Sequence, residues 1–253
     1  MAGEVSDPAV GPTAAWRPLG AALLDFHRGD TEAEIVVTSD LWEPEPTPVA
    51  AFYRPDDQPL PAIERDAVGL CRGRVLDLGA GAGRHSLAVQ QRGHQVVAVD
   101  PLPEAVSIMR DRGVEDPRLG VLDSVAGERF DTVVMLMHGV GIVGDIHGLG
   151  VLLETAYQLL EPGGRLVCDS ADLSAVLKDE APELLDATNR TGRYLGEVEF
   201  QLGYRGMIGP PYPWLFVDPT TLACLGSAAG FQVQIVRRGD RGSYLALLES
   251  AAT

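Results

Sequence analysis

The chain has 253 residues, which suits one large domain or one domain with an appendage, and its hydrophobic fraction of 45% is ordinary for a folded protein. Its formal net charge of −16, with a single lysine at Lys178, argues against a binder of nucleic-acid backbones, because such proteins need a basic surface. No apolar run reaches the roughly 18 residues of a membrane span, and the N-terminus lacks the pattern of a secretory signal.

Residues 1–59 are expected to form a mobile tail followed by a helical lid segment. Residues 1–15 are rich in Gly, Pro and Ala and show no hydrophobic period, which is typical of a tail. The stretch 18–29 has the spacing of a short amphipathic helix, opened by a proline and closed by a glycine. The proline-punctuated stretch 43–55 is predicted to be irregular at its start.

From residue 60 onward, short β-branched runs alternate with helical segments. Strands are predicted at 73–79, 95–100, 118–124, 130–138 and 165–172, and helices at 60–71, 84–93, 102–113 and 147–160. Strands that are apolar throughout and separated by helices indicate an α/β fold with a doubly wound, parallel sheet.

The C-terminal part departs from this alternation. Residues 193–206 predict a hairpin or one long strand, and the run 209–214, "GPPYPW", is predicted to be a loop. A helix is expected over 218–230 with Asp218 as N-cap, and the two strands within 231–250 lie so close in sequence that they must pair antiparallel. The prediction is a mostly parallel seven-stranded sheet with a C-terminal antiparallel hairpin, in a domain over 60–253 whose insertion 193–217 covers the substrate.

Three glycines at alternate positions within 79–83 follow the first predicted strand of this sheet and precede a helix. A dinucleotide fingerprint needs a further glycine at the sixth position, where the two possible frames have Arg84 and Ser86. Asp77, at the end of the strand, would repel a pyrophosphate but suits a cationic ligand. The loop therefore predicts a ligand with an amino group and a sulfonium.

At these residues the chain resembles the class I S-adenosylmethionine-dependent methyltransferases, over roughly residues 60–250. The resemblance implies S-adenosyl-L-methionine as cofactor and S-adenosyl-L-homocysteine as product. It implies cofactor contacts along the loop at Asp77, Gly79, Ala80, Gly81, Gly83 and Arg84.

Further cofactor contacts are implied at the ends of the next strands. Asp100, 21 residues after Gly79, matches the acidic residue that binds both ribose hydroxyls in the family, and Pro101 follows it. Asp123 and Ser124 match the position beside the adenine. Met137 is expected to line the cofactor after the fourth strand, through backbone atoms.

The remaining candidates surround the reacting end of the cofactor. Tyr53 or Arg54 is expected to reach the methionyl carboxylate, with Arg84 as a rival. Methyl transfer can proceed by positioning alone, and a protein base is needed only where the acceptor holds a proton. His138 is the candidate base, and its alternative role is to shape the pocket as a loop residue.

Aromatic residues of the insertion are the candidate substrate contacts, namely Tyr204, Tyr212 and Trp214. We expect the acceptor pocket to be bounded by His138 below and by residues 193–217 above, with the segment around Tyr53 at one side. The run 209–214 is similar to a motif of base-methylating enzymes, but Gly209 replaces its polar residue and it follows the fifth strand instead of the fourth, so we reject that match.

The function predicted from the sequence is methyl transfer to a small molecule, such as a natural product, in preference to tRNA or rRNA. Two alternatives remain: a non-catalytic protein that binds the cofactor, and a nucleotide-dependent oxidoreductase, which the glycine spacing disfavours. Cys71, Cys168 and Cys224 show no metal-ligand spacing and predict free thiols in a reducing compartment, which we interpret as the cytoplasm, with no metal and no membrane partner.

Overall fold

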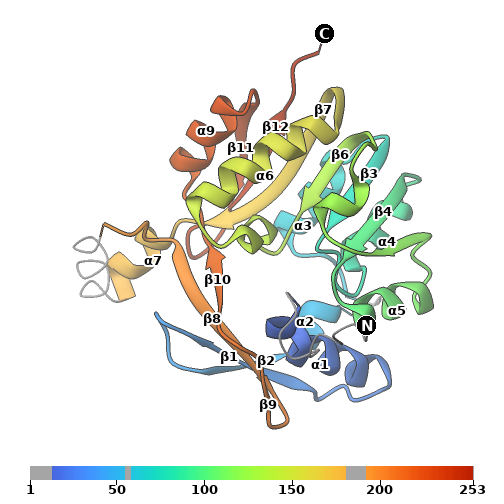
Figure 1. The fold of residues 1–253 in the computed structure, drawn as a ribbon, viewed down its shortest axis with the longest axis vertical. Helices are drawn as coiled ribbons and strands as arrows, with labels where there is room; N and C mark the ends of the chain where they lie inside the picture. The colour runs from blue at the N-terminus through green and yellow to red at the C-terminus, as the bar shows by residue number, and fades with distance from the viewer. Residues whose placement is uncertain (1–12, 55–57, 181–191, 253) are drawn as a thin grey trace, which may run out of the picture.

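The structure is a computed structural model, which describes residues 13–54, 58–180 and 192–252. It has two β-sheets (Figure 1). The strands of the larger sheet are β3 (Arg74–Leu78), β4 (Gln95–Asp100), β5 (Asp116–Leu119), β6 (Phe130–Met135), β7 (Leu160–Ala171), β11 (Gln232–Arg238) and β12 (Ser243–Glu249). Their order is β11-β12-β7-β6-β3-β4-β5, and only the pairs that involve β12 are antiparallel. The predicted seven-stranded sheet with a C-terminal hairpin is confirmed.

Helices cover both faces of this sheet (Figure 1). α6 (Ile146–Leu159) and α9 (Pro219–Ala228) pack on one face, and α3 (Ala62–Leu70), α4 (Arg84–Gln90) and α5 (Pro103–Asp111) pack on the other. Successive residues of the central strands enter opposite apolar layers, because side chains alternate along a strand: Leu76 and Val133 join the first layer, Val75 and Val134 the second. This arrangement fixes the carboxyl ends of β3, β4 and β6 at one edge.

The second sheet is antiparallel and joins two segments that are far apart in sequence. Its strands are β1 (Glu34–Ser39), β2 (Glu45–Pro48), β8 (Glu197–Tyr204), β9 (Met207–Ile208) and β10 (Tyr212–Leu215). The order is β10-β8-β1-β2, with β9 paired to β8. The predicted N-terminal lid segment and the predicted insertion therefore form one sheet.

α1 (Arg17–His27) lies between the second sheet and α5. Leu23 and Phe26 of α1 share an apolar cluster with Ile35 of β1, Leu202 of β8 and Ile108 of α5. The short helix α2 (Ala50–Tyr53) follows β2 and packs in the same cluster. α1 thus anchors the second sheet to the larger one.

The structure corrects three local predictions in these segments. The stretch 43–55 is not irregular at its start, since it contains β2 there, and the predicted loop at 209–214 contributes the first residues of β10. Pro213 is tolerated there because β10 is an edge strand. The predicted tail ends earlier than residue 15, because Ala14 and Ala15 are buried in the 3₁₀-helix η1 (Ala14–Trp16); its residues 1–12 lie outside the described residues.

Three strands of the larger sheet have other limits than predicted. The strand expected at 130–138 is β6, which ends at Met135. The strand expected at 118–124 is β5, which ends at Leu119, and residues 122–125 form the 3₁₀-helix η2 (Leu122–Val125). The strand expected at 165–172 begins already at Leu160. The N-cap prediction is confirmed, since the Asp218 carboxylate accepts hydrogen bonds from the backbone N–H groups of Thr220 and Thr221.

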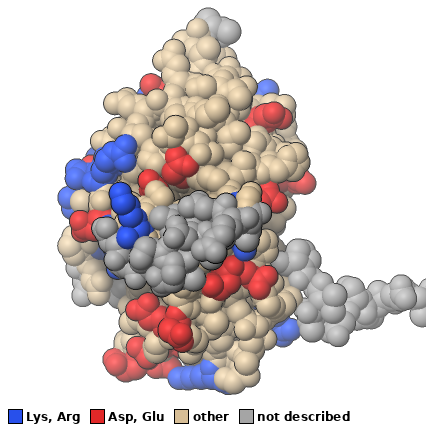
Figure 2. Space-filling view, turned by 90° about the vertical axis from the view of Figure 1, so that its left-hand side faces the viewer, with Lys and Arg blue, Asp and Glu red and all other residues tan. Residues whose placement is uncertain are grey.

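The surface and the helices bear on possible partners. In the part of the chain that the structure describes, no helix is long and apolar enough to cross a membrane. On the face shown in Figure 2, Asp and Glu side chains gather below the centre and Arg side chains gather at one side. The described residues of this face therefore carry mixed charge.

Candidate functional site

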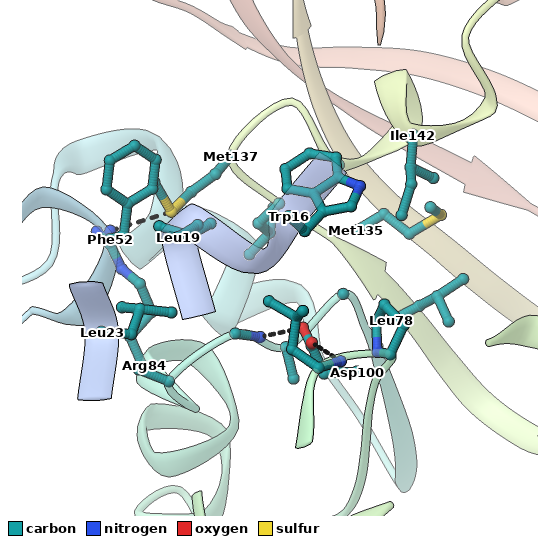
Figure 3. A pocket seen from close by; sticks show the side chains of 18 of the residues that line it. Trp16, Leu19, Leu23, Phe52, Leu78, Arg84, Asp100, Met135, Met137 and Ile142 are labelled. Carbon is teal, nitrogen blue, oxygen red and sulfur yellow. Dashed lines mark hydrogen bonds between the residues drawn. The ribbon is translucent and has the colours of Figure 1, made fainter. Parts of the chain in front are cut away.

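A cavity of about 280 Å³ lies between the carboxyl ends of β3, β4 and β6 and the second sheet. In open α/β sheets ligands bind at this edge. Its floor is formed by the glycine loop, by residues 100–102 and by the segment after β6. Its roof comes from α1, α2 and the second sheet. Figure 3 shows Trp16, at the end of η1, and Leu19, on α1, lying across the cavity from Asp100 and Leu78.

The three loop glycines serve two different purposes. All have positive φ, at 77° for Gly79, 55° for Gly81 and 78° for Gly83, which favours glycine. Gly79 and Gly81 line the cavity, and a Cβ atom added at either would meet no atom within 4 Å. Those side chains would therefore occupy ligand space. A Cβ atom at Gly83 would lie 2.8 Å from a methyl group of Val114, so Gly83 is required by packing.

Asp100 holds the glycine loop from below. Its Oδ2 atom accepts a hydrogen bond from the Gly81 N–H at 2.8 Å, and its Oδ1 atom accepts one from the Leu102 N–H at 2.9 Å. Burial raises the pKa of Asp100 to about 6, although both hydrogen bonds favour the carboxylate. Asp100 and Pro101 line the cavity, as predicted for cofactor-binding residues.

Asp77 lies beneath the loop and does not line the cavity. Its Oδ2 atom accepts a hydrogen bond from the Ser86 hydroxyl at 2.6 Å, which ties the end of β3 to the first turn of α4. Burial raises the pKa of Asp77, while the nearby His85 and the Ser86 hydroxyl lower it. Asp77 therefore supports the loop from the side away from the cavity. Its predicted contact with the cofactor stays a prediction.

Arg84 lines the cavity, and the Glu64 carboxylate compensates its charge. Its Nη2 atom donates to both carboxylate oxygens of Glu64 at 2.7 and 2.5 Å, and its Nη1 atom donates to the Ala51 carbonyl and, at 3.1 Å, to the sulfur of Met137. Figure 3 shows this contact with Met137 beside Phe52. Arg84 Nε is one of the buried nitrogen atoms without a hydrogen-bond partner among the described residues.

Glu64 of α3 organises this end of the cavity. It also contacts His85 Nε2 at 2.8 Å, and His85 lines the cavity. Burial opposes its ionisation, but the hydrogen bond from His85 and the charges of His85 and Arg84 outweigh it and lower the pKa of Glu64. The buried carboxylate therefore keeps both neighbouring side chains in place.

The roof is apolar and largely aromatic. Three strands of the second sheet each contribute residues i and i+2, which is the pattern of side chains on one face of a sheet. These pairs are Ile35 and Val37, Phe200 and Leu202, and Tyr212 and Trp214. Trp16 closes the roof, with ring centroids 4.5 Å from Tyr212 and 5.5 Å from Trp214. Burial raises the pKa of the Tyr212 hydroxyl. Tyr212 and Trp214 thus line this cavity, and their predicted contact with the substrate stays a prediction.

Four predicted residues lie away from this cavity. The Tyr53 ring stacks under Arg112 and its hydroxyl contacts His27, so Phe52 lines the cavity instead. The Tyr204 hydroxyl donates to Asp25 on α1. Asp123 and Ser124 are exposed on η2, because β5 ends before them. The structure does not bring these four residues to the cavity, and their predicted roles stay predictions.

His138 also lies outside the lining of this cavity. It follows Met137, and both residues adopt the left-handed conformation, with φ of 59° each. Met137 lines the first cavity, whereas His138 lines a second cavity and packs against Phe216 with ring centroids 5.3 Å apart. The sequence pattern does not show that the Met137 and His138 side chains enter different cavities. The role of His138 as a base stays a prediction.

Sequence reasoning did not find Glu64, Trp16 and Phe52, nor the roof residues of β1 and β8. The run of β-branched residues in "EIVVTS" at 34–39 was the local signal for β1. Among the described residues, no group of three or more His, Cys, Asp or Glu side chains is arranged to hold a metal ion.

Comparison with known proteins agrees with this geometry. A family profile described as a methyltransferase domain matches residues 51–234. A SAM-dependent methyltransferase from Bacteroides fragilis, solved with S-adenosyl-L-homocysteine, is 33% identical and superposes with a TM-score of 0.80, covering 95% of this chain and 97% of its own. The CcbJ methyltransferase from Streptomyces caelestis, 17% identical, shares the fold with a TM-score of 0.59, covering 78% of this chain and 100% of its own.

Curated relatives match a shorter region. The ubiquinone biosynthesis O-methyltransferase of Xylella fastidiosa (strain M23) is 30% identical over 153 residues, which are 56% of this chain and 58% of that protein. The chain thus spans little more than half the length of this relative. The family match and the Bacteroides relative together show that the chain belongs to the class I S-adenosylmethionine-dependent methyltransferase family, as the sequence predicts.

Proposed function

We propose that the chain transfers a methyl group from S-adenosyl-L-methionine to a small-molecule acceptor. The observation that carries this proposal is the covered cavity over the glycine loop, with Asp100 in its floor and aromatic rings in its roof. A volume of about 280 Å³ lies near the lower end of the range for sites that enclose a small ligand, roughly 300–1,000 Å³.

The residues of the floor fit the cofactor. Space is free above Gly79 and Gly81. A carboxylate has about four lone-pair sites, so Asp100 can accept from two ribose hydroxyls while it holds its two backbone N–H groups. Arg84 and His85, held by Glu64, lie at the other end, and the buried Arg84 Nε atom lacks a hydrogen-bond partner among the described residues. We assign the methionine end of the cofactor to this region.

When bound, the cofactor supplies an electrophilic methyl group on a sulfonium. The residues of this chain bind and orient it: the loop and Asp100 fix one end, and Arg84 and His85 fix the other. The apolar roof from α1 and the second sheet excludes water. Holding donor and acceptor in line supplies much of the rate of such a displacement. Residues 193–217 and the segment before residue 60 thus act as the cover of the site.

The class of acceptor rests on the size and the enclosure of the site. A roof built from side chains of α1 and three strands leaves no broad groove for a nucleic acid at this cavity. The curated relatives carry names of O-methyltransferases that act in ubiquinone biosynthesis, which supports a small organic acceptor in the same class. The free thiols Cys71, Cys168 and Cys224 support the prediction of a reducing, cytoplasmic environment.

A thermal shift experiment tests the cofactor assignment. S-adenosyl-L-homocysteine and NADH are added separately at the same saturating concentration. A ligand at 100 times its Kd stabilises by about 2.7 kcal/mol, which is a rise of several degrees in Tm. We expect this rise with S-adenosyl-L-homocysteine and no rise with NADH. A rise with NADH alone would support the oxidoreductase alternative. Methyl transfer to an acceptor then separates an enzyme from a protein that only binds the cofactor.

A further inference from the structure

A second cavity of about 520 Å³ lies beyond the ends of β6 and β7. It is lined by the segment from β1 through β2, by α7 (Leu173–Glu180), by β8 and by the turn between β11 and β12. Side chains that line it are Ser39, Trp42, Thr47, His138, Phe216 and Ser243.

The second cavity adjoins the first. Val37 and Phe200 line both cavities, so the two cavities meet at these side chains. The backbone turn at Met137 and His138 sends the Met137 side chain to the first cavity and the His138 side chain to the second. Two consecutive non-glycine residues in the left-handed region are strained, and such strain gathers at functional sites.

Asp169 of β7 holds this turn. Its Oδ1 atom accepts a hydrogen bond from the backbone N–H of His138 at 3.0 Å, and its Oδ2 atom lies 3.7 Å from His138 Nδ1. The Nδ1 atom is buried and has no hydrogen-bond partner in the part of the chain that is described. The His138 side chain is 34% exposed and the Asp169 side chain 8%. The pair therefore presents an imidazole to the cavity with a buried carboxylate behind it.

The charges around the second cavity are unequal. Glu43 and Glu45 line it from the segment between β1 and β2, Asp240 and Arg241 from the turn between β11 and β12. Among the described residues that line it, three carboxylates to one guanidinium make the cavity favourable for a cation. The described residues of the first cavity include no such set, and its volume suits one molecule.

We propose that the second cavity binds the acceptor, that this acceptor carries a basic amine, and that His138 is the catalytic base with Asp169 as its positioning residue. The inference rests on the proposed function, because it places the acceptor relative to the cofactor. His138 removes one proton from the ammonium group. The nitrogen lone pair then forms the N–CH₃ bond while the S–CH₃ bond breaks, which leaves the thioether S-adenosyl-L-homocysteine and a methylated ammonium.

The geometry gives His138 two kinds of neighbour. Asp169 faces it from β7, and the charged rim of Glu43, Glu45, Asp240 and Arg241 faces it across the cavity. Burial raises the pKa of Asp169, and the nearby His138 lowers it. The Asp169 carboxylate, 3.7 Å from His138 Nδ1, is thus placed to orient the imidazole.

The first experiment measures binding of a probe, benzylamine, with S-adenosyl-L-homocysteine already saturating. Trp42 lines the second cavity, whereas Trp16 and Trp214 line the first. We expect benzylamine to quench tryptophan fluorescence at millimolar concentration and benzoate to leave it unchanged. The quenching should be absent from Trp42→Phe. The proposal is overturned if benzoate gives an equal response or if the response persists in Trp42→Phe. It is also overturned if benzylamine gives no response up to 50 mM, which is roughly tenfold above the Kd expected of a ligand of this size.

A covalent block gives an independent test of the location. Thr47 lines the second cavity, and Cys224 is the exposed cysteine among the three. In a Cys224→Ser background, Thr47→Cys is labelled with N-ethylmaleimide. The label should abolish the benzylamine response while the affinity for S-adenosyl-L-homocysteine stays within twofold. Loss of S-adenosyl-L-homocysteine binding instead would mean that the two cavities are one site. Failure of the unlabelled protein to bind S-adenosyl-L-homocysteine would contradict the proposed function itself.

The roles of the pair are tested by turnover of benzylamine, measured as release of S-adenosyl-L-homocysteine across pH. His138→Asn keeps a residue that tolerates the left-handed conformation. It should lower turnover by about 10²–10⁴-fold, the usual effect of a general base. Asp169→Asn should retain an oxygen for the His138 N–H and shift the acidic limb of the pH profile. Both variants should bind S-adenosyl-L-homocysteine normally. An unchanged profile in both, or no methylation by the parent protein, overturns the assignment.

Discussion

The floor and the roof of the first cavity differ in how the chain builds them. The floor consists of three short segments, each at the end of a strand in the larger sheet: residues 78–82, 100–102 and 135–139. Its charged group is the Asp100 carboxylate, and Arg84 and His85 of α4 line the cavity beside it. The roof consists of apolar side chains from segments that meet only through pairing of β1 with β8. From this difference we expect the floor to recognise the cofactor chemically and the roof to act by closing over it.

The largest effect is expected from a substitution in the floor. Gly81→Val places a branched side chain in free space above the loop, at a φ of 55° that valine rarely adopts. We expect the affinity for S-adenosyl-L-homocysteine, measured by calorimetry, to fall by about 100-fold or more, equivalent to about 2.7 kcal/mol.

Gly93→Val is the matched control. Gly93 has a φ of 86° and open space around its Cβ position, but it does not line the cavity. The control should lose stability from the same kind of backbone strain and keep its affinity. If a folded Gly81→Val protein binds as well as this control, the loop is a turn and not a ligand cradle.

The second prediction concerns Asp100 and pH. Its pKa is raised to about 6 by burial, so the fraction of carboxylate falls from about 90% at pH 7 to about 10% at pH 5. If the carboxylate accepts from ribose hydroxyls, protonation removes that acceptor, and affinity should fall about tenfold as pH drops through this range. The sign follows from the loss of the charged form at low pH.

Asp100→Asn isolates this dependence. The variant should bind S-adenosyl-L-homocysteine about tenfold more weakly at pH 7, since hydrogen bonds to a charged group contribute about 1.5–3 kcal/mol. Its affinity should vary little between pH 7 and pH 5. A tenfold change with pH that persists in Asp100→Asn would assign the titration to another group.

The difference between the floor and the roof also explains which parts of the site the sequence predicted. The glycine loop, Asp100 and Pro101 follow from local patterns, because a parallel strand, its glycine turn and its helix are contiguous in sequence. Glu64, Trp16 and Phe200 do not, because their roles depend on packing between distant segments. The direction of His138 depends on the positive φ of two successive residues, which no hydrophobic period reveals. The second sheet was not predicted, because β1 and β8 are far apart in sequence and pair only in the folded chain.

The third prediction tests the roof. Trp16→Ala removes the ring that contacts both Tyr212 and Trp214. Aromatic pairs contribute about 0.5–1.5 kcal/mol each beyond burial, so we expect the affinity for S-adenosyl-L-homocysteine to fall about three- to tenfold in calorimetry. Trp16→Phe should recover most of this loss. A loss as large as that of Gly81→Val would show that the roof contributes to recognition as strongly as the floor.

The smallest effect is expected at Tyr204, which the sequence suggested as a substrate residue. The structure places its ring in the contact between α1 and β8, where the hydroxyl donates to Asp25 at 2.9 Å and Arg205 lies over the ring. Tyr204→Phe removes that hydrogen bond and leaves the ring. The free energy of unfolding should fall by about 1 kcal/mol in urea titration, the usual contribution of one such bond. Affinity for S-adenosyl-L-homocysteine should not change, because the side chain lies behind the roof. If affinity falls while stability does not, Tyr204 faces the ligand in solution, and α1 together with β8 must then be able to separate from the position seen here.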